Sequence, residues 1–120
     1  VKLETYPGAI AQIVTNLAMN SLKHGYEPGE TGKLQFQVGE QEDKVILNYS
    51  DDGCGIPSEY LSKIFEPFFT TARDRGGTGL GLNIVYNLVT QKLQGRIDVK
   101  SEVNLGTIFI ITLHRQGVVD

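Results

Sequence analysis

The chain has a single cysteine, Cys54, so it can form neither an intrachain disulfide nor a cysteine metal cluster. It has no apolar run as long as a membrane span, and no signal peptide is expected. Lys and Arg form no run and the net charge is −3, which argues against general nucleic-acid binding and against an anionic membrane surface. The two histidines do not have the spacing of a metal-ligand pair.

The composition is that of one globular domain. Hydrophobic residues make up 40% of the chain, and 120 residues are enough to enclose a core. The sequence starts at Val1 without Met and enters a helical pattern almost directly. We therefore expect residues 1–120 to be a single domain of a longer protein, whose transmembrane segments, if any, lie outside this piece.

Hydrophobic spacing predicts an α/β (α+β) domain. Ile10, Ile13 and Leu17 keep helical spacing, and Gly25 is a good helix stop. Ser58 is placed to cap a short helix. The expected helices span 8–25, 58–65 and 79–93, and the expected strands span 33–39, 44–50, 96–102 and 106–114. This order predicts a two-layer sandwich in which a mixed, mostly antiparallel sheet carries helices on one face.

The stretch "DRGGTGLGL" (74–82) places four glycines at the entrance of a helical pattern. Glycines at a helix N-terminus allow a phosphate to approach the backbone N–H groups. A P-loop needs Lys and then Ser or Thr after its last glycine, but Leu82 and Asn83 follow Gly81. The dinucleotide fingerprint also fails, because its sixth position counted from Gly77 is Leu82. On this stretch alone, a flexible loop with a glycine-rich helix entry is an equal alternative to a phosphate site.

A polar stripe runs along the first predicted helix. Its members share one face beside the apolar stripe and are Gln12, Asn16, Asn20 and Lys23. Asn is unfavourable inside a helix, so helix propensity does not explain the two asparagines in this stripe. Amide oxygens suit a Mg²⁺ ion held largely by nucleotide phosphates, and a lysine adds a phosphate donor. A simple solvated face is the alternative.

An acidic turn, "NYSDDGCGIP" (48–57), follows the second predicted strand. Asp51 at the strand end could accept a hydrogen bond from an exocyclic amine such as that of adenine, and Gly53 and Gly55 would let a flat base lie against the backbone. An ordinary Asp-Gly turn is the alternative. We interpret Cys54 as a small packed side chain rather than a nucleophile, because no histidine lies near it in sequence.

Five stretches in order carry a resemblance to a known family: "NLAMNSLKHG", "DDGCGIP", "IFEPFFTT", "GGTGLGLNIV" and "GTIFIITL". Together they resemble the ATP-binding catalytic domain of two-component sensor histidine kinases, a member of the Bergerat (GHKL) fold group. The resemblance covers about Pro7 to His114. It implies a cytoplasmic domain, in a parent that a membrane segment elsewhere would anchor, with ATP and Mg²⁺ as cofactors.

The resemblance implies roles for individual residues. Asn20 would ligate Mg²⁺, with support from Asn16 one turn earlier, and Lys23 would contact phosphate; these three form the implied catalytic set. Asp51 would accept a hydrogen bond from the adenine amino group. The other implied nucleotide contacts are His24, Gly53, Gly55, Ile56, Phe68, Gly77, Thr78, Gly79, Leu80, Gly81 and Thr107.

The resemblance also implies a mobile lid. Phe65, Phe68 and Phe69 would anchor it by packing, and residues 70–77 would order around the γ-phosphate. Arg73 or Arg75 would be the lid residue that reaches this phosphate.

One position separates kinases from ATPases in this fold group. ATPase branches carry a Glu general base where this chain has Asn16. The resemblance therefore implies a γ-phosphoryl donor to a histidine on a separate helical domain, with a response regulator downstream and a monomeric isolated domain. Neither His24 nor His114 lies in an acceptor motif. The alternatives are a degenerate nucleotide-gated interaction module, an ATPase of the same fold, and a serine kinase of the anti-sigma type.

Overall fold

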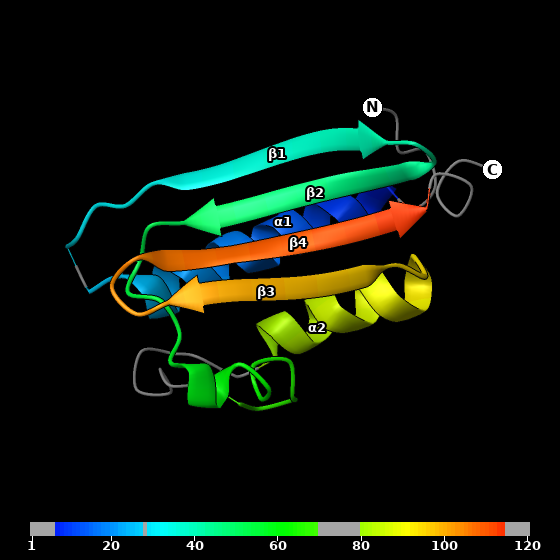
Figure 1. The fold of residues 1–120 in the computed structure, drawn as a ribbon. Coiled ribbons are helices and arrows are strands. Elements are labelled where there is room, and N and C mark those ends of the chain that lie inside the picture. The colour runs from blue at the N-terminus through cyan, green and yellow to red at the C-terminus, as the bar shows by residue number, and fades with distance from the viewer. Residues whose placement is uncertain (1–6, 28, 70–79, 115–120) are drawn as a thin grey trace.

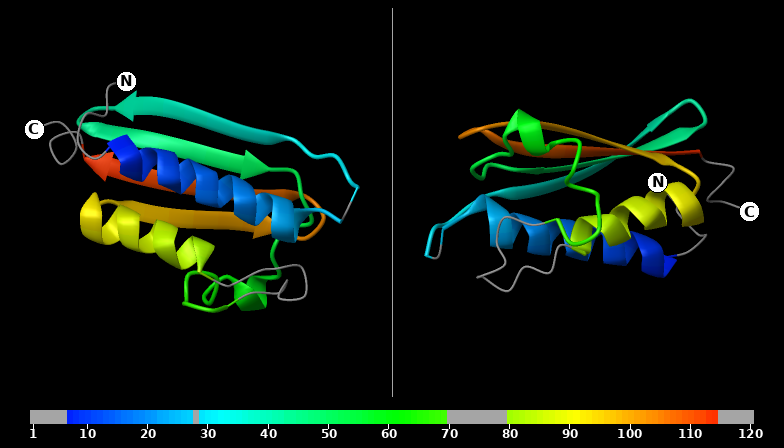
Figure 2. Two further views of the ribbon diagram at one scale, coloured as in Figure 1. Left: turned by 180° about the vertical axis from the view of Figure 1, so that it is seen from behind. Right: turned by 90° about the horizontal axis from the view of Figure 1, so that it is seen from below.

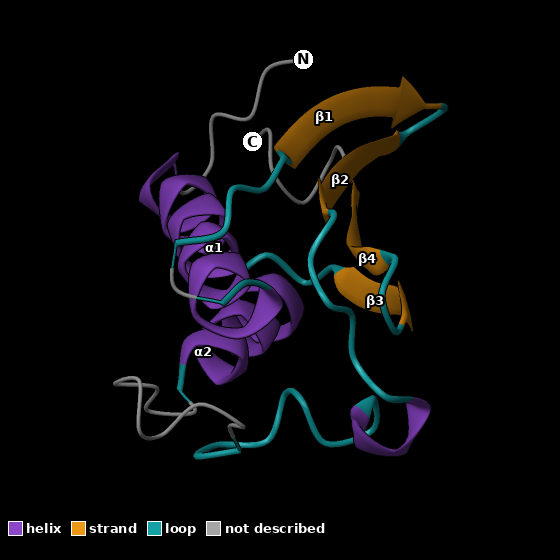
Figure 3. Cartoon of the chain, turned by 90° about the vertical axis from the view of Figure 1, so that its left-hand side faces the viewer, coloured by secondary structure: helices purple, strands orange, loops and turns teal. Residues whose placement is uncertain are grey.

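The computed structural model describes residues 7–27, 29–69 and 80–114. A four-stranded sheet forms one layer, and the helices lie together on one of its faces (Figures 1 and 2). Seen end-on, the two layers separate cleanly (Figure 3). The elements are α1 (Pro7–Asn20), β1 (Leu34–Gln41), β2 (Lys44–Asp51), α2 (Gly81–Asn87), β3 (Arg96–Glu102) and β4 (Gly106–His114). None of the helices in the described ranges is both long and apolar enough to cross a membrane.

The strand order is β1-β2-β4-β3, and each described pair is antiparallel. The predicted two-layer α+β sandwich is confirmed, and its described sheet is antiparallel throughout rather than mixed. Two local hairpins, β1–β2 and β3–β4, meet through the central β2–β4 pair. This pairing sets Asp51 opposite Thr107 and Thr107 opposite Ser101, so three polar residues form a row at one end of the sheet.

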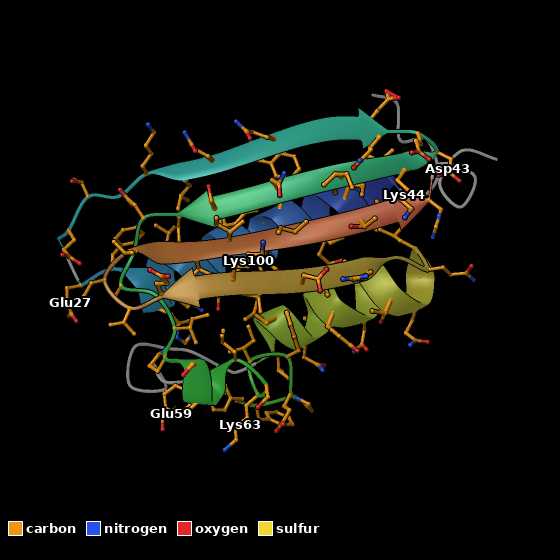
Figure 4. All side chains as sticks on the ribbon, in the orientation of Figure 1. Glu27, Asp43, Lys44, Glu59, Lys63 and Lys100 are labelled. Atoms are coloured by element: carbon orange, nitrogen blue, oxygen red, sulfur yellow. The ribbon has the colours of Figure 1, made fainter. Side chains whose placement is uncertain are left out.

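Alternation along the central strands builds the core. Val45, Leu47 and Tyr49 of β2 and Thr107, Phe109, Ile111 and Leu113 of β4 are buried. Against them pack the apolar sides of the helices, with Ile13, Leu17, Val85 and Val89 fully or almost fully buried. The opposite face of the sheet is left open, as Lys100 on β3 illustrates (Figure 4).

The helix ends differ in detail from the predictions. The helix expected over 8–25 is α1 followed by a π-helical turn, Ser21–Gly25, and Gly25 is its last residue as predicted. The helix expected over 79–93 begins at Gly81 in the described residues and closes with a second π-helical turn, Leu88–Lys92.

The capping role predicted for Ser58 is wrong. Pro57 occupies the N-cap position in an extended conformation, so Ser58 already lies inside a single 3₁₀ turn, Ser58–Tyr60. Proline has no side-chain acceptor, so no N-cap side-chain bond closes this described turn. Residues 61–65 continue as turns, and Pro67 disfavours helical geometry at the residue before it.

Two neighbouring positions on β4 test this packing. Phe109 is fully buried and Ile108, the preceding residue, is 42% exposed on the open face. We expect Phe109→Ala to lower the free energy of unfolding by about 3–5 kcal/mol, and Ile108→Ala by less than about 1 kcal/mol. Urea unfolding of both variants measures the difference. Similar losses at the two positions would contradict the assignment of the buried face.

Candidate functional site

A cavity of about 620 Å³ opens at the end of the sheet where β2 finishes. Its walls come from the carboxyl end of α1, the glycine turn after β2, the segment 56–69 and the start of α2. In Figure 2 the carboxyl end of α1 reaches the same end of the sheet as the β3–β4 turn. The lining includes most of the described residues that the sequence singled out: Asn16, Asn20, Lys23, His24, Asp51, Gly55, Ile56, Leu80, Gly81 and Thr107.

Asp51 is held in place by two internal hydrogen bonds. The backbone N–H of Gly53 donates to Oδ1 at 3.0 Å, and the Ser21 hydroxyl donates to Oδ2 at 2.7 Å. Ser21 in turn lies 2.9 Å from the Tyr49 hydroxyl. Burial raises the pKa of Tyr49 above that of a free phenol, and the charge of Asp51 adds to this rise. Each carboxylate oxygen therefore has a fixed inner partner on the wall of the cavity.

Sequence reasoning missed Ser21 and Tyr49. Ser21 is 1% exposed and Tyr49 is 3% exposed, so both are core residues that carry polar groups. Two features of the sequence could have indicated them. Ser21 places a hydroxyl on the apolar stripe of the helix, four residues after Leu17, and Tyr49 places one at an inward position of the strand. Buried hydroxyls need partners, so such positions predict a polar contact in the interior.

The turn after β2 requires glycines because other backbone segments approach it closely. A Cβ on Gly53 would lie 2.7 Å from the carbonyl oxygen of Gly25 and 2.8 Å from its Cα. The Cys54 N–H donates to the same oxygen at 2.8 Å, which ties the end of α1 to the end of β2. Gly55 has φ +78°, and its Cβ would collide with the Glu102 carbonyl. Gly53 itself does not line the cavity; it acts through its N–H bond to Asp51.

A second hydroxyl cluster lies on the neighbouring strands, around Ser101. Its Oγ accepts from the Ile56 N–H at 2.8 Å and donates to the Gly106 carbonyl at 2.9 Å. Thr107 Oγ1 lies 2.8 Å from Ser101 Oγ. Because the single Ser101 proton goes to Gly106, Thr107 is the donor in this pair. The lone pairs of Thr107 are then left for the cavity that it lines.

The polar stripe that runs along α1 into the Ser21–Gly25 turn divides at the cavity. Asn16, Asn20 and Lys23 line it, whereas Gln12 is exposed and lies outside it. Asn16 Nδ2 is buried and has no hydrogen-bond partner among the described residues. An unpaired buried amide is costly, so a bound polar group at this position would remove a penalty. Gln12 is therefore a solvated residue, whereas the buried Asn16 amide nitrogen favours a binding role for the part of the stripe that lines the cavity.

The neighbouring Asp52 has a different, structural role. It is exposed, and its Oδ1 accepts from the Tyr26 hydroxyl at 2.5 Å and from the Lys33 backbone N–H at 2.8 Å. These bonds lower the pKa of Asp52. Burial, followed by the bond to Asp52, raises the pKa of Tyr26 to about 12. Asp52 therefore fastens the loop between α1 and β1, while Asp51 faces the cavity.

The phenylalanine segment is anchored by Phe65 and Phe69. The Phe65 carbonyl accepts from Asn83 Nδ2 at 3.1 Å, and its ring packs against Tyr86 and Phe109. Phe69 packs on Tyr60, and both line the cavity. Phe68, predicted as a nucleotide contact, is 60% exposed and is not in the lining, so Phe69 occupies that place.

The predicted phosphate loop lies mostly outside the described residues. Gly77, Thr78, Gly79, the two arginines and the lid segment 70–77 belong to this part. Leu80 and Gly81 are described and line the cavity. Cys54 departs from its predicted packed role: it is exposed, lines the cavity, and its thiol donates to the His24 carbonyl at 3.1 Å.

Comparison with known proteins places the chain in a family. Residues 5–117 match the model of the histidine kinase-, DNA gyrase B- and HSP90-like ATPases, and the chain belongs to this family. It is 39% identical to the sensor kinase CckA of Brucella abortus over 120 residues, covering 90% of this chain and 13% of the relative. It therefore spans about an eighth of the length of that relative.

Solved structures agree with the sequence relatives. The catalytic domain of histidine kinase ThkA superposes with a TM-score of 0.76 at 32% identity, covering 92% of this chain and 70% of that chain. Full-length ShkA, solved in complex with AMPPNP, matches with a TM-score of 0.74 at 29% identity, over 88% of this chain and 21% of that chain. The resemblance drawn from the five motifs is confirmed.

Two glycines test the close approach behind the site. We expect Gly53→Ala to lower the free energy of unfolding by about 1–3 kcal/mol, because its Cβ has no room beside Gly25. Gly8→Ala is the matched control, since no described atom lies within 4 Å of a Cβ there. It should change stability by less than about 1 kcal/mol, in the stabilising direction. Thermal unfolding compares them, and equal stability of the two variants would refute the steric argument.

Proposed function

We propose that the chain binds Mg-ATP in the cavity and donates the γ-phosphoryl group to a histidine on a separate helical domain. The observation that carries this proposal is the joining, in one cavity, of Asp51 with the face formed by Asn16, Asn20 and Lys23. A hydrogen-bond acceptor at one side and amide and ammonium groups at the other match the two ends of a nucleotide. The cavity volume of about 620 Å³ lies within the usual range for small-molecule sites.

Asp51 would recognise the adenine base. Its inner lone pairs are occupied by Ser21 and Gly53, so the outer ones can accept from the exocyclic amine. Thr107 and Asp51 are paired across β2 and β4, which gives the base two polar neighbours at one level of the sheet. The bare backbone of Gly55 and the side chain of Ile56 offer a flat wall for the ring.

The amide face of α1 would receive the phosphates and the metal. No group of three or more His, Cys, Asp or Glu residues in the described ranges could hold a metal ion. Neutral amide oxygens of Asn20 and Asn16 suit Mg²⁺ that phosphate oxygens hold for the most part. The ion, when bound, neutralises charge on the phosphates. Gly81 supports the fit, because no described atom lies within 4 Å of its would-be Cβ beside the cavity.

Phosphoryl transfer to an external acceptor fits the residues better than hydrolysis does. Asp51 is the one carboxylate among the described residues that line the cavity, and its place is with Ser21 and Gly53 at the end of β2. Asn16 on α1 has no basic oxygen with which to activate water. The chain's contribution would be to position the nucleotide and balance its charge.

The partners of this reaction would lie elsewhere in a longer protein. The acceptor histidine would belong to a helical dimerisation domain, and a response regulator would receive the group next. This agrees with the much greater length of the sensor-kinase relatives and with the AMPPNP complex of ShkA. We expect the isolated chain to be monomeric, because dimerisation would reside in the helical domain.

Calorimetric titration should separate the two ends of the cavity. Asp51→Asn should weaken ATP binding roughly 10- to 150-fold with or without Mg²⁺, because a charged hydrogen bond to the base is lost. Asn20→Ala should instead remove the gain in affinity that Mg²⁺ provides. Gln12→Ala, on the same helix but outside the cavity, should bind as the unmodified chain does. If Asp51→Asn binds ATP normally, Asp51 is not the base contact.

Incubation with γ-labelled ATP should test the transfer itself. The chain alone should neither label itself nor release phosphate steadily, because its sequence has no acceptor motif and the described residues at the phosphate side of the cavity include no carboxylate general base. Addition of the helical histidine domain of the parent protein should give acid-labile phosphohistidine on that domain. Label on the isolated chain, or steady phosphate release, would defeat the proposal.

A further inference from the structure

Two buried hydroxyl groups stand behind Asp51, at core positions beside apolar side chains. Ser21 lies on the apolar side of the helix and Tyr49 on the inward face of β2, after Val45 and Leu47. Their hydroxyls are 2.9 Å apart, and Ser21 Oγ is 2.7 Å from Asp51 Oδ2. They connect the core of the domain to the one carboxylate that faces the cavity among the described lining residues.

The direction of this hydrogen-bond chain follows from counting protons. The Asp51 carboxylate can only accept, so the single Ser21 proton goes to it. The Tyr49 hydroxyl must then donate to Ser21 Oγ. Because burial raises the pKa of Tyr49, this phenol keeps its proton in neutral solution. The chain runs from Tyr49 to Ser21 to Asp51 and ends on Oδ2, opposite the N–H of Gly53 on Oδ1.

We propose that Ser21 and Tyr49 are positioning residues that make the site selective for a purine with an exocyclic amino group. This inference rests on the proposed nucleotide-binding function. With both oxygens fastened from inside, the carboxylate cannot rotate, and its remaining lone pairs point to one place in the cavity. A purine that offers a donor there gains a charged hydrogen bond, and a purine without one gains nothing.

The test compares ATP with purine riboside triphosphate, which carries hydrogen in place of the adenine amino group. The unmodified chain should prefer ATP. Ser21→Ala should weaken ATP binding about tenfold and change binding of the analogue less than about twofold, so the preference collapses. Tyr49→Phe should lower the preference for ATP by a smaller factor than Ser21→Ala does. Tyr86→Phe, a tyrosine on α2 away from the cavity lining, is the matched control and should keep the full preference.

A double variant separates positioning from stability. Ser21→Ala alone leaves the Tyr49 hydroxyl buried without its partner, so the melting temperature should fall. Adding Tyr49→Phe removes that stranded group and should restore much of the melting temperature, because replacing both partners by apolar groups is nearly neutral. The preference for ATP should stay lost in the double variant. Recovery of the preference together with the melting temperature would show a merely structural pair and overturn the inference.

The failures of the two proposals are distinguishable. A chain that binds neither nucleotide would refute the proposed function, and the inference would fall with it. A chain that binds ATP but not more tightly than the analogue would refute the inference and leave nucleotide binding standing. A chain that prefers ATP to the same extent in Ser21→Ala would also refute it.

Discussion

The arrangement of the site depends on the contact between the backbones of Gly25 and Gly53. The Cys54 N–H reaches the Gly25 carbonyl at 2.8 Å, and a side chain on Gly53 would prevent this approach. The contact joins the last helical turn after α1 to the turn after β2, two segments that the sequence separates by the whole β1–β2 hairpin and the loop before it. It thereby sets the amide face of α1 beside Asp51. A side chain at Gly53 would therefore disturb the spacing between the two halves of the cavity.

Strand register supplies the rest of the placement. Asp51, Thr107 and Ser101 stand side by side across three strands, so one row of the sheet supplies two polar lining residues, Asp51 and Thr107, and Ser101, which supports Thr107 from outside the lining. Each polar group in this row is held by a hydroxyl or N–H from a different element. Because register fixes all three at once, a shift of a strand by one residue would turn these groups to the open face. The hydrophobic alternation that buries Phe109 and Ile111 is therefore also what orients the site.

Local patterns were enough to predict the layers, the strands, and the main cavity residues Asn16, Asn20, Lys23 and Asp51, because each lies in a short periodic or turn-forming stretch. They were not enough for Ser21, Tyr49 and Ser101, whose roles depend on pairing between distant elements. Phe69 rather than Phe68 enters the cavity because the chain turns at Phe68, which has φ +68°. A backbone reversal of this kind leaves no signature in a run of similar aromatic residues.

The two sides of the cavity are built on different physical terms. The side around Asp51 is internally satisfied, with each carboxylate oxygen and each supporting hydroxyl already bonded within the described residues. The side around α1 leaves the Asn16 amide nitrogen buried without a partner among them. A wall whose polar groups are already hydrogen-bonded recognises a ligand by its shape and by the lone pairs that face the cavity. A wall with an unpaired polar group gains more free energy when a polar ligand group binds there. Preorganisation at Asp51 would thus fix where a nucleotide sits, and the unmet amide would favour the bound state at the phosphate side. Because Asp51 is the one carboxylate among the described lining residues and lies on the base side, the described phosphate side would offer no carboxylate base to water.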